Sequence, residues 1–179
     1  MDNQGSAQHN PVSTLNSAIG TALAFPFGPG VIPVLIPWLI THWQEGAAYP
    51  LAVRTVGMVL IVAGGIMSVW TFVRFVTEGR GTPWPTDPPT SRKVMVGGPY
   101  RYVRNPLYVG FILAIVGQAL WLSRPVLFIY TGALIVFLAA FVHFWEERTM
   151  AKRYGPEFEA YCKQVPGWWP RLPTRSRSA

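Results

Sequence analysis

The chain has 179 residues, of which 50% are hydrophobic, 14% aromatic and only 13% charged. Soluble domains usually carry about 25% charged residues, so this composition argues against an ordinary soluble protein and predicts an integral membrane protein. The net charge of +7 does not favour nucleic-acid binding, because the basic residues flank apolar segments. The single cysteine excludes an intrachain disulfide and a multi-cysteine metal site, and we expect no bound metal.

The first half of the chain predicts one regular and one interrupted membrane span. Residues 1–17 are polar and lack the basic region of a signal peptide, so we expect a polar N-terminal tail. Residues 18–40 are apolar but contain several prolines and glycines. This pattern predicts a kinked or broken span, whose freed backbone groups need partners on neighbouring helices. Residues 51–76 are almost uninterrupted apolar sequence, longer than the ~20 residues that cross a bilayer as a helix.

The second half predicts a helical hairpin. Residues 107–122 form a short apolar run, and a turn at residues 123–125 leads at once into a second run that ends at residue 145. The Gly-Pro pair at residues 155–156 interrupts the helix that follows, and residues 156–163 have the pattern of a short amphipathic helix. The sequence therefore predicts an all-α, polytopic membrane protein with about four transmembrane helices, the last two as a hairpin, and a short C-terminal cytoplasmic helix.

Basic residues set the predicted orientation. Thirteen of the 15 Lys and Arg residues lie within residues 74–104 or 148–177, and the positive-inside rule assigns both segments to the cytoplasm. Both termini and the candidate site would then face the cytoplasm at a bacterial-type inner (plasma) membrane. We expect one integral membrane domain over residues 18–171 and a disordered tail over residues 172–179. The oligomeric state does not follow from the sequence.

The loop over residues 77–104 carries the first group of candidate site residues. It has about 28 residues, and connections of that length are usually functional or disordered. Asn105-Pro106 predicts the start of a helix, with Asn as the N-cap and Pro at the first position. The free amides of that helix start, preceded by Arg101 and Arg104, would suit a carboxylate or phosphate. The alternative is that both arginines only anchor the loop at the membrane surface.

Glu146 and Glu147 form the second group, at the end of the last long apolar run. A lipid-facing helix has no use for two carboxylates, because charge near hydrocarbon is costly. They could bind ribose hydroxyls or a cationic ligand, or pair with Arg101, Arg104 or Arg74. The alternative is a pair of charges that faces water at a helix end. His143 lies four residues before Glu147, so the two can share a helix face, although a single histidine there is more often structural.

Read in order, these segments resemble a known family of membrane enzymes. Residues 98–110 read GPYRYVRNPLYVG, which closely resembles a motif of the isoprenylcysteine carboxyl methyltransferase family and its phospholipid methyltransferase relatives. The order and spacing of further pieces agree: Glu146-Glu147, Tyr154-Gly155, Phe158 and Tyr161, Val165-Pro166 and Trp169-Pro170-Arg171. The resemblance covers about residues 79–171, and residues 1–75 match only as generic spans.

The resemblance implies an integral membrane methyltransferase that uses S-adenosylmethionine. The cofactor-binding residues that it implies are Tyr100, Arg101, Arg104, Asn105, Pro106, Tyr108, Gly110, Glu146 and Glu147. Of these, Arg104, Asn105 and Glu147 are the expected catalytic residues. The chemistry fits, because the cofactor's carboxylate suits arginine, and its ribose diol, ammonium and sulfonium suit carboxylates. The expected partners are membrane lipids and a methyl acceptor that is a lipid, a prenylcysteine or another amphiphile.

One position departs from the family pattern, and two other functions compete with methyl transfer. The best-known members carry a histidine where this chain has Asn105, and Asn does not titrate near neutral pH. Proton transfer at this position, and with it the identity of the acceptor, is therefore open. The alternatives are an NADPH-dependent membrane reductase related to sterol reductases and a non-catalytic membrane protein on the same scaffold.

Overall fold

The computed structural model describes residues 26–78 and 97–169, and it is helical, without strands, in these two ranges. Two helices are long and apolar enough to cross a membrane, over Leu51–Arg74 and Val126–Lys152. Shorter apolar helices cover Gly30–Thr41 and Pro106–Trp121. The expected all-α architecture is therefore confirmed. The polar tail at residues 1–17, the start of the first span, most of the 77–104 loop and the tail at 172–179 lie outside the described residues.

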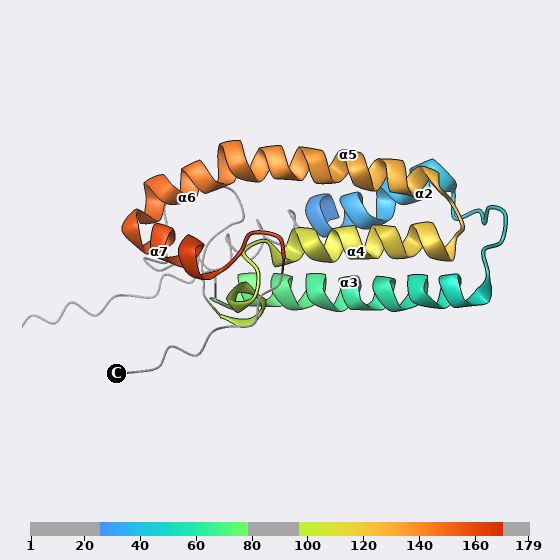
Figure 1. Ribbon diagram of the computed structural model, residues 1–179, viewed down its shortest axis with the longest axis horizontal. Coiled ribbons are helices and arrows are strands. Elements are labelled where there is room, and N and C mark those ends of the chain that lie inside the picture. Colours follow the sequence, from blue (N-terminus) through green and yellow to red (C-terminus); the bar gives the residue numbers. More distant parts are fainter. Residues whose placement is uncertain (1–25, 79–96, 170–179) are drawn as a thin grey trace, which may run out of the picture.

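Helices α3 (Leu51–Glu78), α4 (Pro106–Trp121) and α5 (Val126–Phe141) run along the long axis of the molecule. The π-helix η1 (Pro26–Leu35) and the short α2 (Ile36–Thr41) lie beside α4 and α5 (Figure 1). The predicted hairpin is present: α4 and α5 are antiparallel, and the turn between them places Ser123 at a φ of 55°. A core of buried side chains joins α4 to α5: Ile115, Ala119, Leu122, Leu127, Leu134 and Leu138.

The closest helix contact is nevertheless between α3 and α4. A Cβ atom built on Gly64 would lie 2.5 Å from the carbonyl oxygen of Gly110 and 2.6 Å from the amide nitrogen of Ala114. One on Gly57 would lie 2.8 Å from the carbonyl oxygen of Gly117. Small residues that let two backbones approach are typical of helix pairs in membranes, where packing replaces the hydrophobic effect.

The proline-rich first span is held by side chains of its neighbours. Pro37 has no N–H, so it cannot donate to the carbonyl groups one turn earlier, those of Ile32 and Pro33. The hydroxyl of Tyr130 on α5 donates to the Ile32 carbonyl at 2.9 Å, and Nε2 of Gln118 on α4 donates to the Pro33 carbonyl at 2.7 Å. As expected, freed backbone groups of this proline-rich segment have partners on neighbouring helices.

The last long helix changes its geometry before it ends. It continues from α5 through the π-helical segment η3 (Val142–Glu146) into α6 (Glu147–Tyr154), and it bends toward α7 (Pro156–Gln164) (Figure 1). A π segment within an α-helix is rare and often marks a functional site. Gly155, at a φ of 55°, separates α6 from α7, as the Gly-Pro pair predicts. This turn folds α7 back toward the start of α4 (Figure 1).

Candidate active site

The C-terminal segment is bonded to the residues that precede α4. The amide of Arg104 donates to the carbonyl of Pro166 at 2.9 Å, and the amide of Asn105 donates to the carbonyl of Gly167 at 3.3 Å. The side-chain Nδ2 of Asn105 donates to the same Gly167 oxygen at 3.1 Å. Val103 is fully buried beside these bonds. Residues 103–105 and 165–167 are therefore held against each other by backbone hydrogen bonds.

The expected capping role of Asn105 is wrong. Pro106 does begin α4 and Asn105 stands at the N-cap position, but its side chain makes no capping hydrogen bond. The side chain is 9% exposed and its amide group is turned toward Gly167. A buried amide needs a partner, and the carbonyl of the returning chain supplies one. Asn105 thus positions the C-terminal segment instead of closing the end of α4.

Arg104 links three parts of the chain. Its Nη1 atom lies 2.8 Å from Oε1 of Glu147 on α6 and 2.8 Å from Sγ of Cys162 on α7. The side chains of Arg104 and Glu147 are 20% and 33% exposed, so water screens this ion pair only in part. Nε of Arg104 is buried and has no hydrogen-bond partner among the described residues. The guanidinium therefore retains a donor beyond those that hold α6 and α7.

The second oxygen of the same glutamate faces a histidine. Nδ1 of His143 lies 3.8 Å from Oε2 of Glu147, one helical turn away, as the i,i+4 spacing predicts. The imidazole is 69% exposed, and its ring makes an edge contact with Phe144 at 5.0 Å between centroids. Glu147 thus lies between a guanidinium and an imidazole.

Glu146 takes part in a separate cluster. Its Oε2 atom accepts a hydrogen bond of 3.2 Å from the hydroxyl of Tyr108, and the Tyr108 ring stacks on Trp168 at 6.4 Å between centroids. The two adjacent glutamates therefore have different surroundings: Glu147 joins Arg104, and Glu146 joins Tyr108. The sequence did not distinguish their roles.

Tyrosine hydroxyls near the site stay protonated at neutral pH. Burial raises the pKa of Tyr161 to about 12, although the positive charge of Arg104 opposes this rise. Its hydroxyl donates to the carbonyl oxygen of Tyr100 at 2.8 Å and joins α7 to η2 (Gly98–Arg101). Burial, together with the negative charge of Glu146, also raises the pKa of Tyr100. Both hydroxyls are therefore uncharged at neutral pH.

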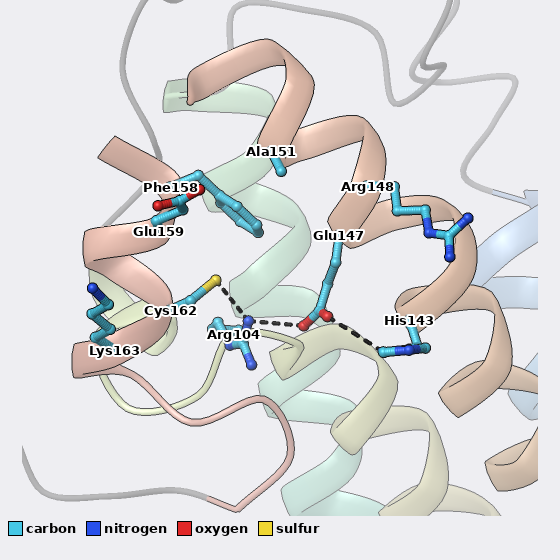
Figure 2. A pocket seen from close by; sticks show the side chains of 9 residues that line it. All are labelled: Arg104, His143, Glu147, Arg148, Ala151, Phe158, Glu159, Cys162 and Lys163. Carbon is cyan, nitrogen blue, oxygen red and sulfur yellow. Dashed lines mark hydrogen bonds and ion pairs between the residues drawn. The ribbon is translucent and has the colours of Figure 1, made fainter. Parts of the chain in front are cut away.

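A pocket of about 630 Å³ opens between α6, α7 and Arg104 in the segment before α4. Figure 2 shows Arg104 and Glu147 at its centre, Cys162 on one side and His143 on the other. The remaining lining residues are Arg148, Ala151, Phe158, Glu159 and Lys163. Burial raises the pKa of the Cys162 thiol against the opposing effect of Arg104, so the thiol is predominantly protonated at neutral pH.

The structure brings some of the predicted residues together and separates others. Arg104 and Glu147 line the pocket. Asn105, Tyr108, Glu146 and Tyr100 lie next to it in the hydrogen bonds described above, and Pro106 is buried at the start of α4. Arg101 is exposed. Gly110 faces Gly64 and Ser68 of α3, so it serves helix packing at that position.

The pocket also contains residues that sequence reasoning did not assign to a site. Cys162, Phe158 and Glu159 on α7, and Arg148 and Ala151 on α6, form much of its wall. Phe158 and Cys162 are four residues apart, a spacing that puts them on one helix face. The spacing predicts that the two side chains share a helix face, but it does not predict which part of the protein that face contacts.

Comparison with known proteins identifies the family of the chain. A comparison with curated protein sequences finds no match. The sequence model of the phospholipid methyltransferase family matches residues 53–157, a range that covers α3 to the start of α7 and includes Arg104, Glu146 and Glu147. This match extends over more than half of the chain and agrees with the resemblance read from its motifs. The chain belongs to the phospholipid methyltransferase family.

Proposed function

We propose that this protein is an S-adenosylmethionine-dependent membrane methyltransferase whose cofactor binds in the pocket between α6 and α7. The observation that carries the proposal is the Arg104–Glu147 pair, 2.8 Å apart in the wall of that pocket. Membership of a methyltransferase family supports the reaction class. The paired groups have the charges that a zwitterionic cofactor needs.

The residues of the pocket fit this cofactor. A volume of about 630 Å³ lies within the range of about 300–1,000 Å³ that is usual for small-molecule sites. Arg104 and the nearby Arg148 suit the cofactor's carboxylate. Glu147 suits its ribose hydroxyls or its ammonium group, and Phe158 offers an apolar surface for an aromatic base. When bound, the cofactor supplies an electrophilic methyl group on a sulfonium.

The protein's own residues would contribute position and electrostatics. Methyl transfer is an in-line displacement, so most of the catalysis comes from holding the reactants in line and from fixed charges nearby. Arg104 is suited to this role because its backbone is bonded to Pro166 and its side chain to Glu147 and Cys162. Asn105 would act indirectly, by holding the C-terminal segment in place.

We also propose a four-span arrangement with the site in the cytoplasm. The spans would be η1 with α2, then α3, α4 and α5, in one domain over residues 18–171. Apolar side chains exposed on α5 support a lipid contact: Ile129, Val136 and Phe137 are 75%, 71% and 63% exposed. The basic residues at the site end of the molecule support the orientation under the positive-inside rule.

We propose further that the acceptor is a lipid, a prenylcysteine or a similar amphiphile, and that it reaches the pocket from the membrane. Phe144 and Trp145 support this route, since they are 61% and 59% exposed within two or three residues of Glu147. Aromatic side chains of this kind favour the membrane–water interface. The membrane would be of the bacterial inner (plasma) type.

The test is transfer of a tritiated methyl group from S-adenosylmethionine to lipid by the purified protein in vesicles. The vesicles would contain phosphatidylethanolamine, and a farnesylcysteine analogue would be added in parallel. We expect radioactivity in the lipid extract, reduced at least tenfold in Glu147→Gln. The matched control is Glu45→Gln, which breaks a 2.8 Å ion pair with Arg54 outside the pocket. Equal activity of Glu147→Gln and the wild type would contradict the assignment of the site.

A further inference from the structure

His143 lies in the pocket wall, and its Nδ1 atom faces the carboxylate of Glu147 from beyond hydrogen-bond distance. Nδ1 lies 3.8 Å from Oε2 of Glu147, while Oε1 of the same carboxylate is held at 2.8 Å by Arg104. No hydrogen bond joins Nε2 to another described residue, and the side chain is 69% exposed. A carboxylate that faces one nitrogen of a histidine favours a proton there and leaves a lone pair on the other nitrogen. Figure 2 shows this order of Arg104, Glu147 and His143 along one side of the pocket.

The other ionisable groups that line the pocket are poorly suited to accept a proton at neutral pH. Oε1 of Glu147 accepts a 2.8 Å hydrogen bond from Arg104, whose positive charge disfavours protonation of the carboxylate. Burial raises the pKa of the Cys162 thiol and keeps it protonated. Arg148 and Lys163 are of residue types that are cations at neutral pH. Glu159 is exposed, and ordinary exposed carboxylates are weak bases.

We propose that His143 removes a proton from the molecule that is methylated in this pocket, an inference that rests on the proposed function. The N–H bond of an ammonium or the S–H bond of a thiol breaks, and the proton binds to the lone pair of Nε2. The electron pair of the broken bond stays on the acceptor's nitrogen or sulfur and would form the new bond to the methyl carbon, whose bond to the cofactor's sulfur would break and leave its electron pair on that sulfur. The imidazolium then returns its proton to water at the exposed side of the ring. Glu147 stabilises the imidazolium during this interval.

The charges that surround His143 come from three segments. On its own helix they are Glu147 and Arg148; before α4 there is Arg104; on α7 there are Glu159, Cys162 and Lys163. Of these groups, Glu147 has a recorded contact with His143, at 3.8 Å from Nδ1. The guanidinium of Arg148 lies 5.7 Å from the centre of the Phe144 ring.

If His143 removes a proton, it matters only for methyl acceptors that must lose one. Ammonium and thiol acceptors carry a proton that must leave, whereas a carboxylate acceptor is already ionised at neutral pH. His143 is thus needed for an amine or thiol acceptor and is dispensable for a carboxylate. General-base catalysis typically contributes about 10²–10⁴-fold to a rate, so the difference between acceptors is measurable.

The first arm of the test does not depend on activity. The full chain would be labelled with ¹⁵N-histidine in lipid nanodiscs, and the His143 signals assigned by comparison with His143→Gln. We expect the tautomer with hydrogen on Nδ1, and a change in tautomer in Glu147→Gln. Glu146→Gln, at the adjacent carboxylate, is the matched control and should leave the signal unchanged. A His143 signal that does not respond to Glu147→Gln would overturn the proposal.

The second arm compares three acceptors with the same chain: dodecylamine, dodecanethiol and dodecanoate. We expect His143→Gln to lower methyl transfer to an amine or thiol by about 100-fold or more near pH 7, and to leave any transfer to dodecanoate unchanged. The loss should shrink as the pH rises and the acceptor ionises unaided. Equal loss for every acceptor, or no loss for any, would overturn the role of His143.

Binding of S-adenosylhomocysteine separates the two proposals. If the wild type does not bind it, the proposed function fails. If the wild type and His143→Gln bind it equally while neither test on His143 gives the expected result, only this inference fails. Should none of the three acceptors be methylated, the tautomer measurement alone decides the inference, since it needs no substrate.

Discussion

Arg104 and Glu147 are 43 residues apart in the chain, and Nη1 of Arg104 lies 2.8 Å from Oε1 of Glu147. The contact joins the segment before α4 to the first residue of α6. Because the same Nη1 atom also contacts Cys162 of α7, the pocket forms only when three segments pack together. The ion pair is therefore a structural link as well as a candidate ligand-binding pair.

Substitutions that break this ion pair should destabilise the protein, and the effects of the two single substitutions should not add up in the double variant. Arg104→Gln and Glu147→Gln should each lower the free energy of unfolding by roughly 1–2 kcal/mol, since a partly buried charge loses its hydrogen-bond partner. The double variant should lose less than the sum of the two, because no unpaired charge is left. Denaturant unfolding in detergent micelles measures all three differences. Strictly additive losses would show that the two side chains do not interact.

Cys162 provides a chemical probe of the pocket, as it is the only cysteine in the chain. Only the thiolate is alkylated, and burial raises the pKa of this thiol. We therefore expect alkylation by iodoacetamide to be slower at about pH 8 than for a free thiol, whose pKa is about 8.5. The rate should go on rising at higher pH, where that of a free thiol levels off.

A bound ligand in the pocket should also protect Cys162. Saturating S-adenosylhomocysteine should slow the alkylation, and mass spectrometry would locate and quantify the label. The Cys162→Ser variant is the control that measures alkylation at other residues. Alkylation at the rate of a free thiol, with or without the ligand, would contradict the place of this side chain in the pocket wall.

The packing of α3 on α4 allows a comparison between adjacent glycines. Gly64→Ala should destabilise the protein by about 1–3 kcal/mol, because its Cβ would lie 2.5 Å from the Gly110 carbonyl oxygen and the helices must move apart. Gly65→Ala is the control, since a Cβ there meets nothing within 4 Å. Thermal unfolding in detergent measures both. Similar midpoints for the two variants would argue against the close contact.

The bonds to the broken first span are open to a direct test. Gln118→Leu leaves the Pro33 carbonyl without its 2.7 Å donor, and Tyr130→Phe removes the 2.9 Å donor to Ile32. Each should cost about 0.5–2 kcal/mol, the range found for polar contacts between membrane helices. Thr131→Val is the control, because Thr131 bonds only to a carbonyl of its own helix. A control variant as unstable as the other two would contradict the interhelical role.

Local patterns predicted most of the elements and singled out both partners of the central ion pair. The apolar run at residues 51–76 became α3, and Pro106 and Pro156 each begin a helix. These outcomes follow from chain-local physics, since apolar length, proline and glycine act over one or two turns. The two carboxylates at residues 146–147 stood out for the same reason, because charge at the end of an apolar run is costly.

Tertiary contacts decided what the sequence left open or predicted wrongly. Asn105 has a high propensity to cap a helix, yet its amide bonds to the Gly167 carbonyl, 62 residues away. Gly110 faces α3 instead of the pocket, which depends on which helix α4 packs against. Cys162 enters the site because the chain folds back at Gly155. No local pattern encodes these partners.

The most direct test of the central claim is calorimetric binding of S-adenosylhomocysteine to the purified protein in detergent, with NADPH as the competing ligand. We expect micromolar binding of S-adenosylhomocysteine and none of NADPH. Arg104→Ala and Glu147→Ala should each weaken binding by about 10–100-fold, the equivalent of a lost charged hydrogen bond. Lys152→Ala, an exposed cation on α6 outside the pocket, should bind as the wild type does. Binding of NADPH instead, or binding that survives both substitutions, would contradict the account.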